Sequence, residues 1–483
     1  MRTGFYSPLP PANTGVADYS ATLIEAMRGF GRVDVNPAEA DVRLYHLGNN
    51  PLHREIYRRA LEQPRVIVLH DAVLHHFLLG SLSKEQYIDE FVYNYGEWMR
   101  DAAQDLWRGR ARSAATREYF RYPMLKRIVE ASTGVVVHNP GAAAMVRLHC
   151  PRARVFEIPH LYRAAAAAIG VGRLKDRLGL GPHHFVFGVF GYLRESKRLM
   201  PVLRAFRLVR RAQPNAALLV AGSFASADLE RAAEPLLASP GVIYTGTTPQ
   251  QEFDALITRV NVCINLRHPA AGETSGITIR AMGAGKAVIL TDTPETSRFP
   301  ENMCLRIAAD PDEERTLAAL MLWLAQNPAA AREIGCRAAS YIEREHNLER
   351  VARLYWEALG YNLAMAKETQ PMSVDAIQAK SGRIVRLDSA LDAIVSESAA
   401  IEKLAGGFSF TEGPVWIPEG YLLFSDIPEN TIYKWSPDTG IEVFRKPSGC
   451  DRIGVAPGVF RGSNGLTLDA QGRLTICEHG NRR

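Results

Sequence analysis

Residues 185–222 have the sequence FVFGVFGYLRESKRLMPVLRAFRLVRRAQPNAALLVAG. The first six residues form a continuous apolar run, which predicts a buried parallel strand. Apolar side chains then recur with a 3.6-residue period from Leu199 to Arg211, as they do on one face of a helix. A second apolar run at residues 216–222 predicts another strand. The stretch therefore predicts a β-α-β unit.

A cationic turn joins the first strand to the helix. It runs from Gly191 to Lys197 and carries Arg194 as a second cation. Open α/β sheets bind their ligands at the carboxyl ends of their strands, where this turn lies. Basic side chains and helix amino termini at that place favour phosphate. A solvated turn without a ligand is the alternative, but the strand-turn-helix context favours a phosphate site.

The composition is that of a multidomain globular protein. A chain of 483 residues exceeds one core and predicts roughly three domains. No apolar run of about 18 residues is present, and the amino terminus lacks a signal-peptide pattern. The six cysteines are scattered without a C-x-x-C pair, which predicts reduced thiols and a cytoplasmic location. The net charge of +5 is mild, and we expect no nucleic-acid partner.

The first domain also predicts a ligand-facing sheet edge. A strand at residues 4–7 runs into a Pro-rich loop that ends at Gly15, and a helix follows. A clearer strand at residues 65–69 is followed directly by His70 and Asp71. His70 is a candidate general base at this position, and a structural hydrogen-bonding role is the alternative.

Residues 82–132 are expected to form a long helical segment. Arginines and lysines alternate there with tryptophan, tyrosine and phenylalanine. A solvated cationic helix face is the favoured interpretation, since acids interrupt the apolar pattern. The alternative is a peripheral surface that meets anionic lipid or a lipid-linked acceptor.

The second domain continues with a strand at residues 260–266 and a loop at residues 267–276. This loop opens a helix at residues 277–283, so its backbone N–H groups lie at a helix amino terminus beside the Glu273 carboxylate. Such a site suits sugar hydroxyls and a diphosphate together. A helix cap is the alternative role for Glu273.

These motifs together resemble a known enzyme family. Residues 1 to about 365 are similar to retaining glycosyltransferases of the GT-B fold, in particular family 4. The resemblance rests on the Pro-rich loop with Gly15, on His70-Asp71, on Gly191…Arg194…Lys197, and on Glu273 before the run 281–288. It implies two Rossmann-like lobes, with a nucleotide-sugar donor on the second and a carbohydrate or lipid-linked acceptor on the first.

The resemblance also assigns roles to residues. Arg194 and Lys197 would stabilise the departing nucleotide electrostatically, so that transfer requires no metal cofactor. Glu273 would contact sugar hydroxyls, and His70 would lie near the reacting carbon. The expected donor-binding residues are Gly15, Gly191, Arg194, Lys197, Glu273, Ser275, Gly276 and Arg280. The sequence departs from the family at Arg280, where the family usually has a second acidic residue that contacts the nucleotide ribose. The spacing also differs, because Glu273 is one position closer to Arg280 than the usual spacing between the two acids.

The sequence pattern changes near residue 401. Short apolar runs alternate with turn signals, which predicts an antiparallel propeller. Residues 411–416, 424–427 and 463–467 resemble the start of the gluconolactonase/regucalcin family. The resemblance implies Glu412 and Asn464 as residues of a partial site for Ca²⁺ or Mg²⁺. Residues 396–483 suffice for about two blades, so we expect an incomplete propeller without lactonase activity.

The sequence thus predicts an α/β fold of two Rossmann-like lobes followed by part of a β-propeller. A glycosyltransferase is the leading function. The alternatives are a metal-dependent lactonase centred on Glu412, and a sugar-nucleotide binding protein that Arg280 has made inactive. The expected boundaries are 1–165 and 171–345 for the lobes, 346–365 for a helix that crosses back, 366–395 for a linker, and 396–483 for the propeller part.

Overall fold

The chain divides into two compact units, residues 1–367 and 368–483. The computed structural model describes residues 2–12, 14–164, 178–368, 404–450 and 462–478, together with 395, 396 and 399. The linker expected at 366–395 lies outside these residues, apart from residue 395 and the end of a helix that reaches Glu368.

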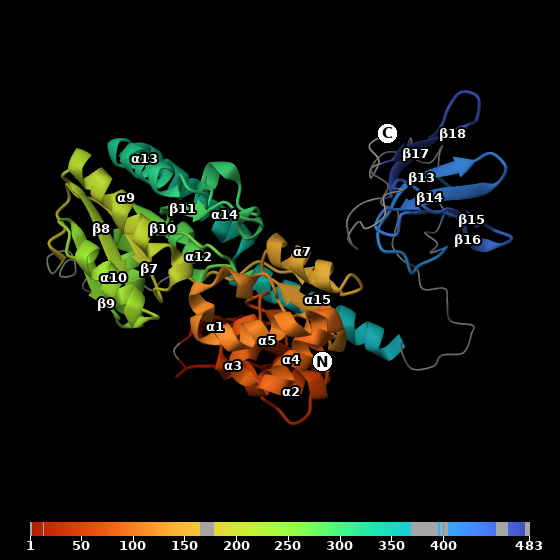
Figure 1. Ribbon diagram of the computed structural model, residues 1–483, viewed down its shortest axis with the longest axis horizontal. Helices are drawn as coiled ribbons and strands as arrows, with labels where there is room; N and C mark the ends of the chain where they lie inside the picture. The colour runs from red at the N-terminus through yellow and green to blue at the C-terminus, as the bar shows by residue number, and fades with distance from the viewer. Residues whose placement is uncertain are drawn as a thin grey trace. The chain divides into compact units, whose positions relative to one another are not determined.

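The first lobe of the first unit is a six-stranded parallel sheet in the order β2-β1-β3-β4-β5-β6. Its strands are β1 (Arg2–Tyr6), β2 (Arg32–Val35), β3 (Val42–Leu47), β4 (Val66–Leu69), β5 (Gly134–Val137) and β6 (Val155–Glu157). The helices that connect them include α1 (Gly15–Arg28), α2 (Arg54–Glu62), α3 (His75–Ser81) and α7 (Pro140–His149). Figure 1 shows these helices in red and orange around the sheet.

The second lobe repeats this architecture with the strand order β12-β11-β10-β7-β8-β9. Its strands are β7 (Phe185–Phe190), β8 (Ala216–Ala221), β9 (Val242–Gly246), β10 (Val262–Asn265), β11 (Ala287–Thr291) and β12 (Leu305–Ile307). Its helices include α9 (Leu199–Ala212), α10 (Ala227–Leu237), α11 (Gln250–Arg259), α12 (Gly276–Gly283), α13 (Glu313–Gln326) and α14 (Pro328–Glu345). The expected β-α-β unit is β7-α9-β8, with β7 and β8 parallel and in register.

Burial explains why β7 is apolar at every position. All six of its residues are buried, because helices cover both faces of the sheet. Gly188 provides the closest packing: a Cβ there would lie 2.5 Å from the Phe190 ring and 2.6 Å from Val260. The apolar face of α9, with Val202, Leu203 and Phe206, packs onto this strand region.

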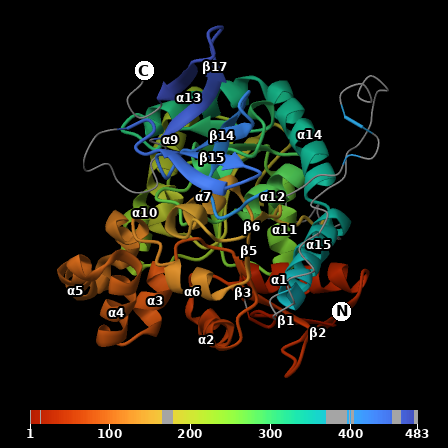
Figure 2. The ribbon, with the colours of Figure 1, turned by 90° about the vertical axis from the view of Figure 1, so that its right-hand side faces the viewer.

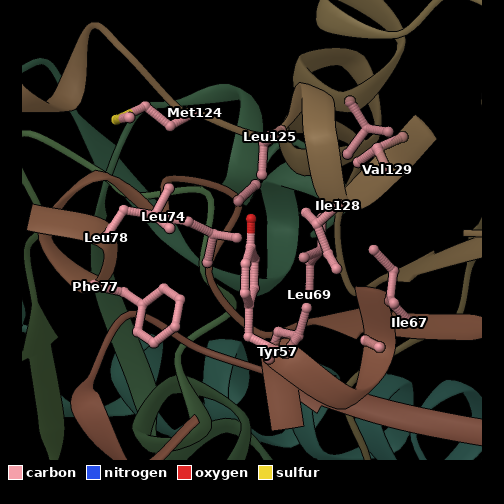
Figure 3. Close-up of a cluster of buried hydrophobic side chains, with 14 of the residues drawn as sticks. Tyr57, Ile67, Leu69, Leu74, Phe77, Leu78, Met124, Leu125, Ile128 and Val129 are labelled. Carbon is pink, nitrogen blue, oxygen red and sulfur yellow. The ribbon is translucent and has the colours of Figure 1, made fainter. Parts of the chain in front are cut away.

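A second apolar core lies under α2 and α3 in the first lobe (Figure 3). The ring of Tyr57 stands among apolar side chains, and its hydroxyl oxygen points into the cluster. That oxygen is buried and has no hydrogen-bond partner among the described residues. The cluster includes Ile67, Leu69, Leu74, Phe77, Leu78, Leu125, Ile128 and Val129.

The segment expected to be one long helix, residues 82–132, is instead broken into short pieces. These are α4 (Lys84–Tyr95), η2 (Glu97–Met99), α5 (Arg100–Gly109), η3 (Arg110–Ala115), η4 (Arg117–Phe120) and α6 (Lys126–Ala131). Gly96 has a positive φ of 97° and ends α4. Met124 also has a positive φ, of 55°, before α6 begins. Local turn geometry therefore overrides the helical pattern.

A break between two helices comes at the start of the helix expected at residues 346–365. The break falls at His346, between α14 and α15 (Leu348–Glu368). Helix α15 packs against the first lobe, close to α1 in Figure 2. The hydroxyls of Tyr19 and Tyr355 are 2.9 Å apart, and Trp356 Nε1 donates to the carbonyl oxygen of Met27 at 3.0 Å.

The described part of the second unit consists of antiparallel strands. A four-stranded sheet has the order β13-β14-β15-β16, and β17 pairs with β18. The strands are β13 (Thr411–Ile417), β14 (Tyr421–Asp426), β15 (Thr431–Ser436), β16 (Gly440–Arg445), β17 (Ser463–Leu468) and β18 (Leu474–Glu478). Ile417, Leu423, Ile432 and Leu466 form a small apolar core between the two sheets.

Candidate functional site

Charged side chains from both lobes gather where their parallel strands end. Asp71 follows β4 of the first lobe, whereas Arg194 follows β7 and Arg267 follows β10 of the second. Glu273 lies on the loop between β10 and α12. The charges of Arg194, Arg267 and Glu273 all act on the pKa of Asp71, so these groups share one region between the lobes. The site is therefore built from the carboxyl ends of two sheets.

Lys197 lies deepest in this region. Its Nζ donates a hydrogen bond of 2.8 Å to the carbonyl oxygen of Phe190, at the end of β7. Burial, together with the nearby charges of Arg267 and Arg194, holds the pKa of Lys197 well below its usual range. Gly191 leaves room for the ammonium group, because a Cβ there would lie 2.9 Å from Nζ. Its φ of +86° also suits glycine.

Arg194 is the exposed cation of the cluster. Its side chain has no ion-pair partner within the part of the chain that the structure describes. Its charge nonetheless lowers the pKa of Asp71 and of Glu273, so the guanidinium lies near both carboxylates. Arg194 is thus a cation that is available to an anionic ligand.

Arg267 and Glu273 form a nearly buried ion pair. Arg267 Nη1 lies 2.8 Å from Glu273 Oε1, and the two side chains are 16% and 14% exposed. Glu273 Oε2 accepts a hydrogen bond of 2.7 Å from the backbone N–H of Ala271. Burial opposes ionisation, but Arg267 and Arg194 outweigh it and hold the pKa of Glu273 below its usual value. Glu273 is therefore ionised and fixed, rather than a helix cap.

Asp71 is the second carboxylate. Its Oδ2 accepts a hydrogen bond of 2.8 Å from the backbone N–H of Asn49. Burial and the neighbouring Glu273 raise the pKa of Asp71 to about 6. One carboxylate is thus firmly ionised and the other titrates near neutral pH, as expected for two like charges in one site.

His70 lies beside this cluster in a group of buried aromatic rings. Its Nε2 is 2.9 Å from Nδ1 of His46, and the Tyr19 ring lies 4.9 Å away at its edge. Burial and the neighbouring His138 hold the pKa of His70 well below its usual range, so its imidazole is neutral. The ring is available as a neutral hydrogen-bonding group near the ligand region, and not as a cation.

The expected phosphate-facing glycines lie at two helix amino termini. Gly15 begins α1, and a Cβ there would meet nothing within 4 Å, so the helix terminus faces open space. Gly276 begins α12 after Ser275, whose Oγ caps the helix at the N–H of Thr278. Ser275 Oγ also accepts hydrogen bonds from Asn265 and from Arg267, at 2.5 and 3.2 Å. Its hydroxyl is thus committed within the protein.

Arg280 is separate from the Arg194–Lys197–Arg267 cluster. It projects from α12 toward α1 and α11, where it lies 3.8 Å from Asp18 and 3.3 Å from Asp254. Asp18 belongs to the first lobe and Asp254 to the second, so Arg280 bridges the lobes. At the position where the resemblance expects an acid for ribose, the structure places an interlobe ion pair.

Direct hydrogen bonds also close the lobes on each other. The N–H groups of Ala72 and Val73 both donate to the carbonyl oxygen of Ala271, at 2.8 and 2.9 Å. Gly272, with a φ of +76°, allows this approach, because a Cβ there would lie 2.5 Å from the Cβ of Ala72. A cavity of about 30 Å³ remains beside the loop, lined in part by Arg267, Glu273, Thr291, Thr293 and Glu295.

Three residues of the site, Asp71, Arg267 and Asn139, are absent from the donor-binding residues that the sequence predicts. Arg267 directly follows a buried strand in the same way as Asp71. Asn139 likewise follows β5, and its side chain bonds to both neighbours of Glu273. Position after a parallel strand is the signal in the sequence that could have found all three.

Four of the eight cations of residues 97–127 form ion pairs with acids of the described residues. Arg100, Arg108 and Arg121 each form an ion pair with an acid three residues earlier, and Arg127 pairs with Glu90. Nothing in these contacts favours a lipid surface over solvent.

In the second unit, the backbones at Glu412 and Asn464 approach each other. Gly413 has a φ of +60°, and a Cβ there would lie 2.3 Å from the carbonyl oxygen of Asn464. The Asn464 side chain is exposed and that of Glu412 is half-buried. Among the described residues, no cluster of three His, Cys, Asp or Glu side chains is suited to a metal ion.

Comparisons with known proteins agree with this architecture. Residues 184–327 match the family model of the group 1 glycosyl transferases, and all of the second-lobe site residues lie within this range. The first unit has the GT-B fold. Residues 410–483 match the SMP-30/gluconolactonase/LRE-like region, so both resemblances inferred from the sequence are confirmed for these segments.

Similar solved structures support the GT-B fold across both lobes. Sucrose-phosphate synthase from Thermosynechococcus elongatus is 16% identical, with a TM-score of 0.54 over 76% of this chain and 100% of that one. HepE of Anabaena, solved with UDP and glucose, is 12% identical, with a TM-score of 0.53 over 75% and 100%. WaaG, a glycosyltransferase involved in lipopolysaccharide biosynthesis, is 13% identical, with a TM-score of 0.50 over 74% and 99%.

A curated relative matches about a fifth of the chain. The gluconolactonase of Zymomonas mobilis is 41% identical over 104 residues. This alignment covers 21% of the chain and 29% of the relative's length.

Among the described helices, none combines the length and the apolar character that a membrane crossing needs.

Proposed function

We propose that the first unit is a glycosyltransferase that moves a sugar from a nucleoside diphosphate to an acceptor. One observation carries the proposal: Arg194, Lys197 and Arg267 converge at the strand ends of the second lobe, facing Asp71 of the first. Arg194 and Arg267 are cations of this site, and Lys197 adds a third positive charge when a bound anion raises its lowered pKa. Such a site suits a diphosphate.

The same cations would act in the reaction itself. As the glycosidic bond breaks, negative charge grows on the departing nucleotide, and fixed cations stabilise that charge without reorganisation. A protein-supplied charge of this kind takes the role that a metal ion fills elsewhere, so we propose metal-independent transfer. Glu273 is held by Arg267 and Ala271 in an orientation suited to accept hydrogen bonds from sugar hydroxyls.

We further propose that the enzyme retains the configuration of the sugar. His70 is neutral and buried beside the site, so it suits a hydrogen bond to the sugar better than the removal of a proton. Support for a uridine nucleotide comes from the GT-B protein HepE, which was solved with UDP and glucose. The six unpaired cysteines suit a reducing compartment, and we propose a cytoplasmic location.

Calorimetry with UDP-, GDP- and ADP-sugars tests the proposal. We expect one nucleotide series to bind, and Arg194→Ala with Lys197→Ala to abolish turnover while the protein stays folded. Arg108→Ala is a matched control, because Arg108 is an exposed arginine of the first lobe paired with Asp105. Unchanged transfer in the double variant would contradict the proposal. Donor binding by the native protein without turnover over an acceptor panel would favour the binding-protein alternative.

A lactonase site in the second unit is the other candidate. Glu412 and Asn464 lie on neighbouring strands and offer a carboxylate and an amide oxygen. Two such donors fall short of the six to eight oxygens that Ca²⁺ takes, so we derive no reaction step there. Lactone hydrolysis by the full chain that a chelator abolishes would establish this second function.

A further inference from the structure

Asn139 connects the two lobes at the Glu273 loop. It follows β5 in the first lobe, and its side chain is buried. Its Nδ2 donates to the carbonyl oxygen of Gly272 at 3.0 Å and to Thr274 Oγ1 at 2.9 Å. One amide group of the first lobe thus holds the residues on both sides of Glu273 in the second lobe.

The same side chain also caps a helix. Asn139 Oδ1 accepts a hydrogen bond of 2.7 Å from the N–H of Ala142 in the first turn of α7. The cap fixes which end of the amide is oxygen, because only oxygen accepts from a backbone N–H. The nitrogen must therefore point across the lobe boundary. Both donor hydrogens of Nδ2 are used, so the cap aims the amide at the loop.

We propose that Asn139 is a positioning residue that orients Glu273 when the lobes close. Its bonds to Gly272 and Thr274 join different lobes, so they exist only in the closed arrangement. The Ala72 and Val73 N–H groups reinforce this by holding Ala271, whose own N–H contacts Glu273. When the lobes close around a donor, these bonds thus fix the orientation of the Glu273 carboxylate, which acts by binding the sugar. The inference rests on the proposed transferase activity.

Two variants separate the interlobe bonds from the helix cap. Asn139→Ser keeps a good cap for α7 and removes the amide donor. Thr274→Val removes one acceptor and keeps the side-chain shape. Asn50→Ser is the matched control, since Asn50 also caps a helix in the first lobe, through its Oδ1 and the N–H of Leu52.

Hydrogen exchange is the first readout, because it needs no turnover. We expect amides of residues 269–276 to exchange about 10-fold faster in Asn139→Ser, and α7 amides to stay protected. Asn50→Ser should change neither segment. Equal acceleration in the loop and in α7 would show a structural cap only and overturn the proposal. An unchanged loop would also overturn it.

Kinetics with UDP-glucose provides the second readout. Asn139→Ser should lower kcat about 10-fold with little change in KM, because the lost bonds act on a geometry reached after binding. Thr274→Val should lower kcat less, and the double variant should be no worse than Asn139→Ser alone. A rise in KM with unchanged kcat would contradict positioning. If the native protein transfers no sugar but Asn139→Ser still exchanges faster in the loop, the transferase proposal is refuted and the interlobe hydrogen bonds of Asn139 are supported.

Discussion

Arg267 and Glu273 form an ion pair within a single loop, with 2.8 Å between Nη1 and Oε1. Arg267 opens the loop after β10, and Glu273 lies three residues before α12 begins. The pair thus braces the loop that carries the Glu273 carboxylate. Both side chains are almost buried. If one partner is removed, water therefore does not replace it beside the remaining charge.

The first prediction follows from this burial. Arg267→Gln or Glu273→Gln should each destabilise the first unit by about 3 kcal/mol, since either change leaves a buried charge without its partner. The double variant should be less destabilised than the two losses summed. Urea denaturation of the three variants measures this coupling. Strictly additive losses would show that the two residues do not depend on each other.

The second prediction concerns a proton at Lys197. Burial and the charges of Arg267 and Arg194 hold the pKa of this lysine well below its usual range in the empty site. A bound diphosphate adds negative charge and should raise that pKa, so donor binding should be accompanied by proton uptake in the pH range between the pKa of the empty site and that of the occupied site. Calorimetry of UDP binding in buffers of different ionisation enthalpy measures the uptake. Equal enthalpies in all buffers would contradict it, and Lys197→Met should remove it.

The third prediction concerns Asp71. Its folded-state pKa is about 6, above the ordinary 3.8, so the folded protein holds this proton more tightly than the unfolded chain. Stability should therefore fall as pH rises from about 4 to about 6, by up to about 3 kcal/mol, and remain lower above that range. Asp71→Asn should remove this fall and stabilise the first unit at pH 8. The exposed Asp89→Asn is the control, and a fall that persists in Asp71→Asn would contradict the assignment.

The two sheets are predictable from the sequence because their strands carry strong local signals. β7 is apolar at every position, and β4 is followed by polar residues, so burial and strand ends can both be recognised. The same signals predict that Arg194, Lys197 and Glu273 lie in one region, since each follows a strand of the same sheet. In a parallel sheet the residues that follow the strands lie along the same edge, so their proximity can be predicted from the sequence.

The remaining features depend on contacts that are distant in sequence. Asn139 follows β5, but its partners Gly272 and Thr274 lie on the other lobe, and its position in the sequence does not identify them. Arg280 pairs with Asp18, a partner on α1 of the other lobe. The breaks at Gly96 and His346 arise from local backbone geometry, which the 3.6-residue pattern of the flanking helices does not reveal.

The fourth prediction tests the role of Arg280. Its pairs with Asp18 and Asp254 are partly exposed, so Arg280→Ala should cost less than about 1 kcal/mol of stability. If the arginine serves the lobe boundary, UDP affinity measured by calorimetry should change less than about twofold. Asp254→Asn is the matched control, because it weakens the same contact from the other side. A large loss of affinity in Arg280→Ala alone would show that the side chain contacts the nucleotide.

The fifth prediction uses the unpartnered hydroxyl of Tyr57. This oxygen is buried among apolar side chains (Figure 3) and has no hydrogen-bond partner among the described residues. Folding therefore removes it from water without a replacement bond, so Tyr57→Phe should stabilise the first unit by about 1 kcal/mol. Tyr45→Phe is the matched control: the Tyr45 hydroxyl donates to the carbonyl oxygen of Gln63 at 3.0 Å, so its loss should destabilise by a similar amount. Urea denaturation of both variants decides the matter, and a loss of stability in Tyr57→Phe would mean that its hydroxyl is satisfied in solution.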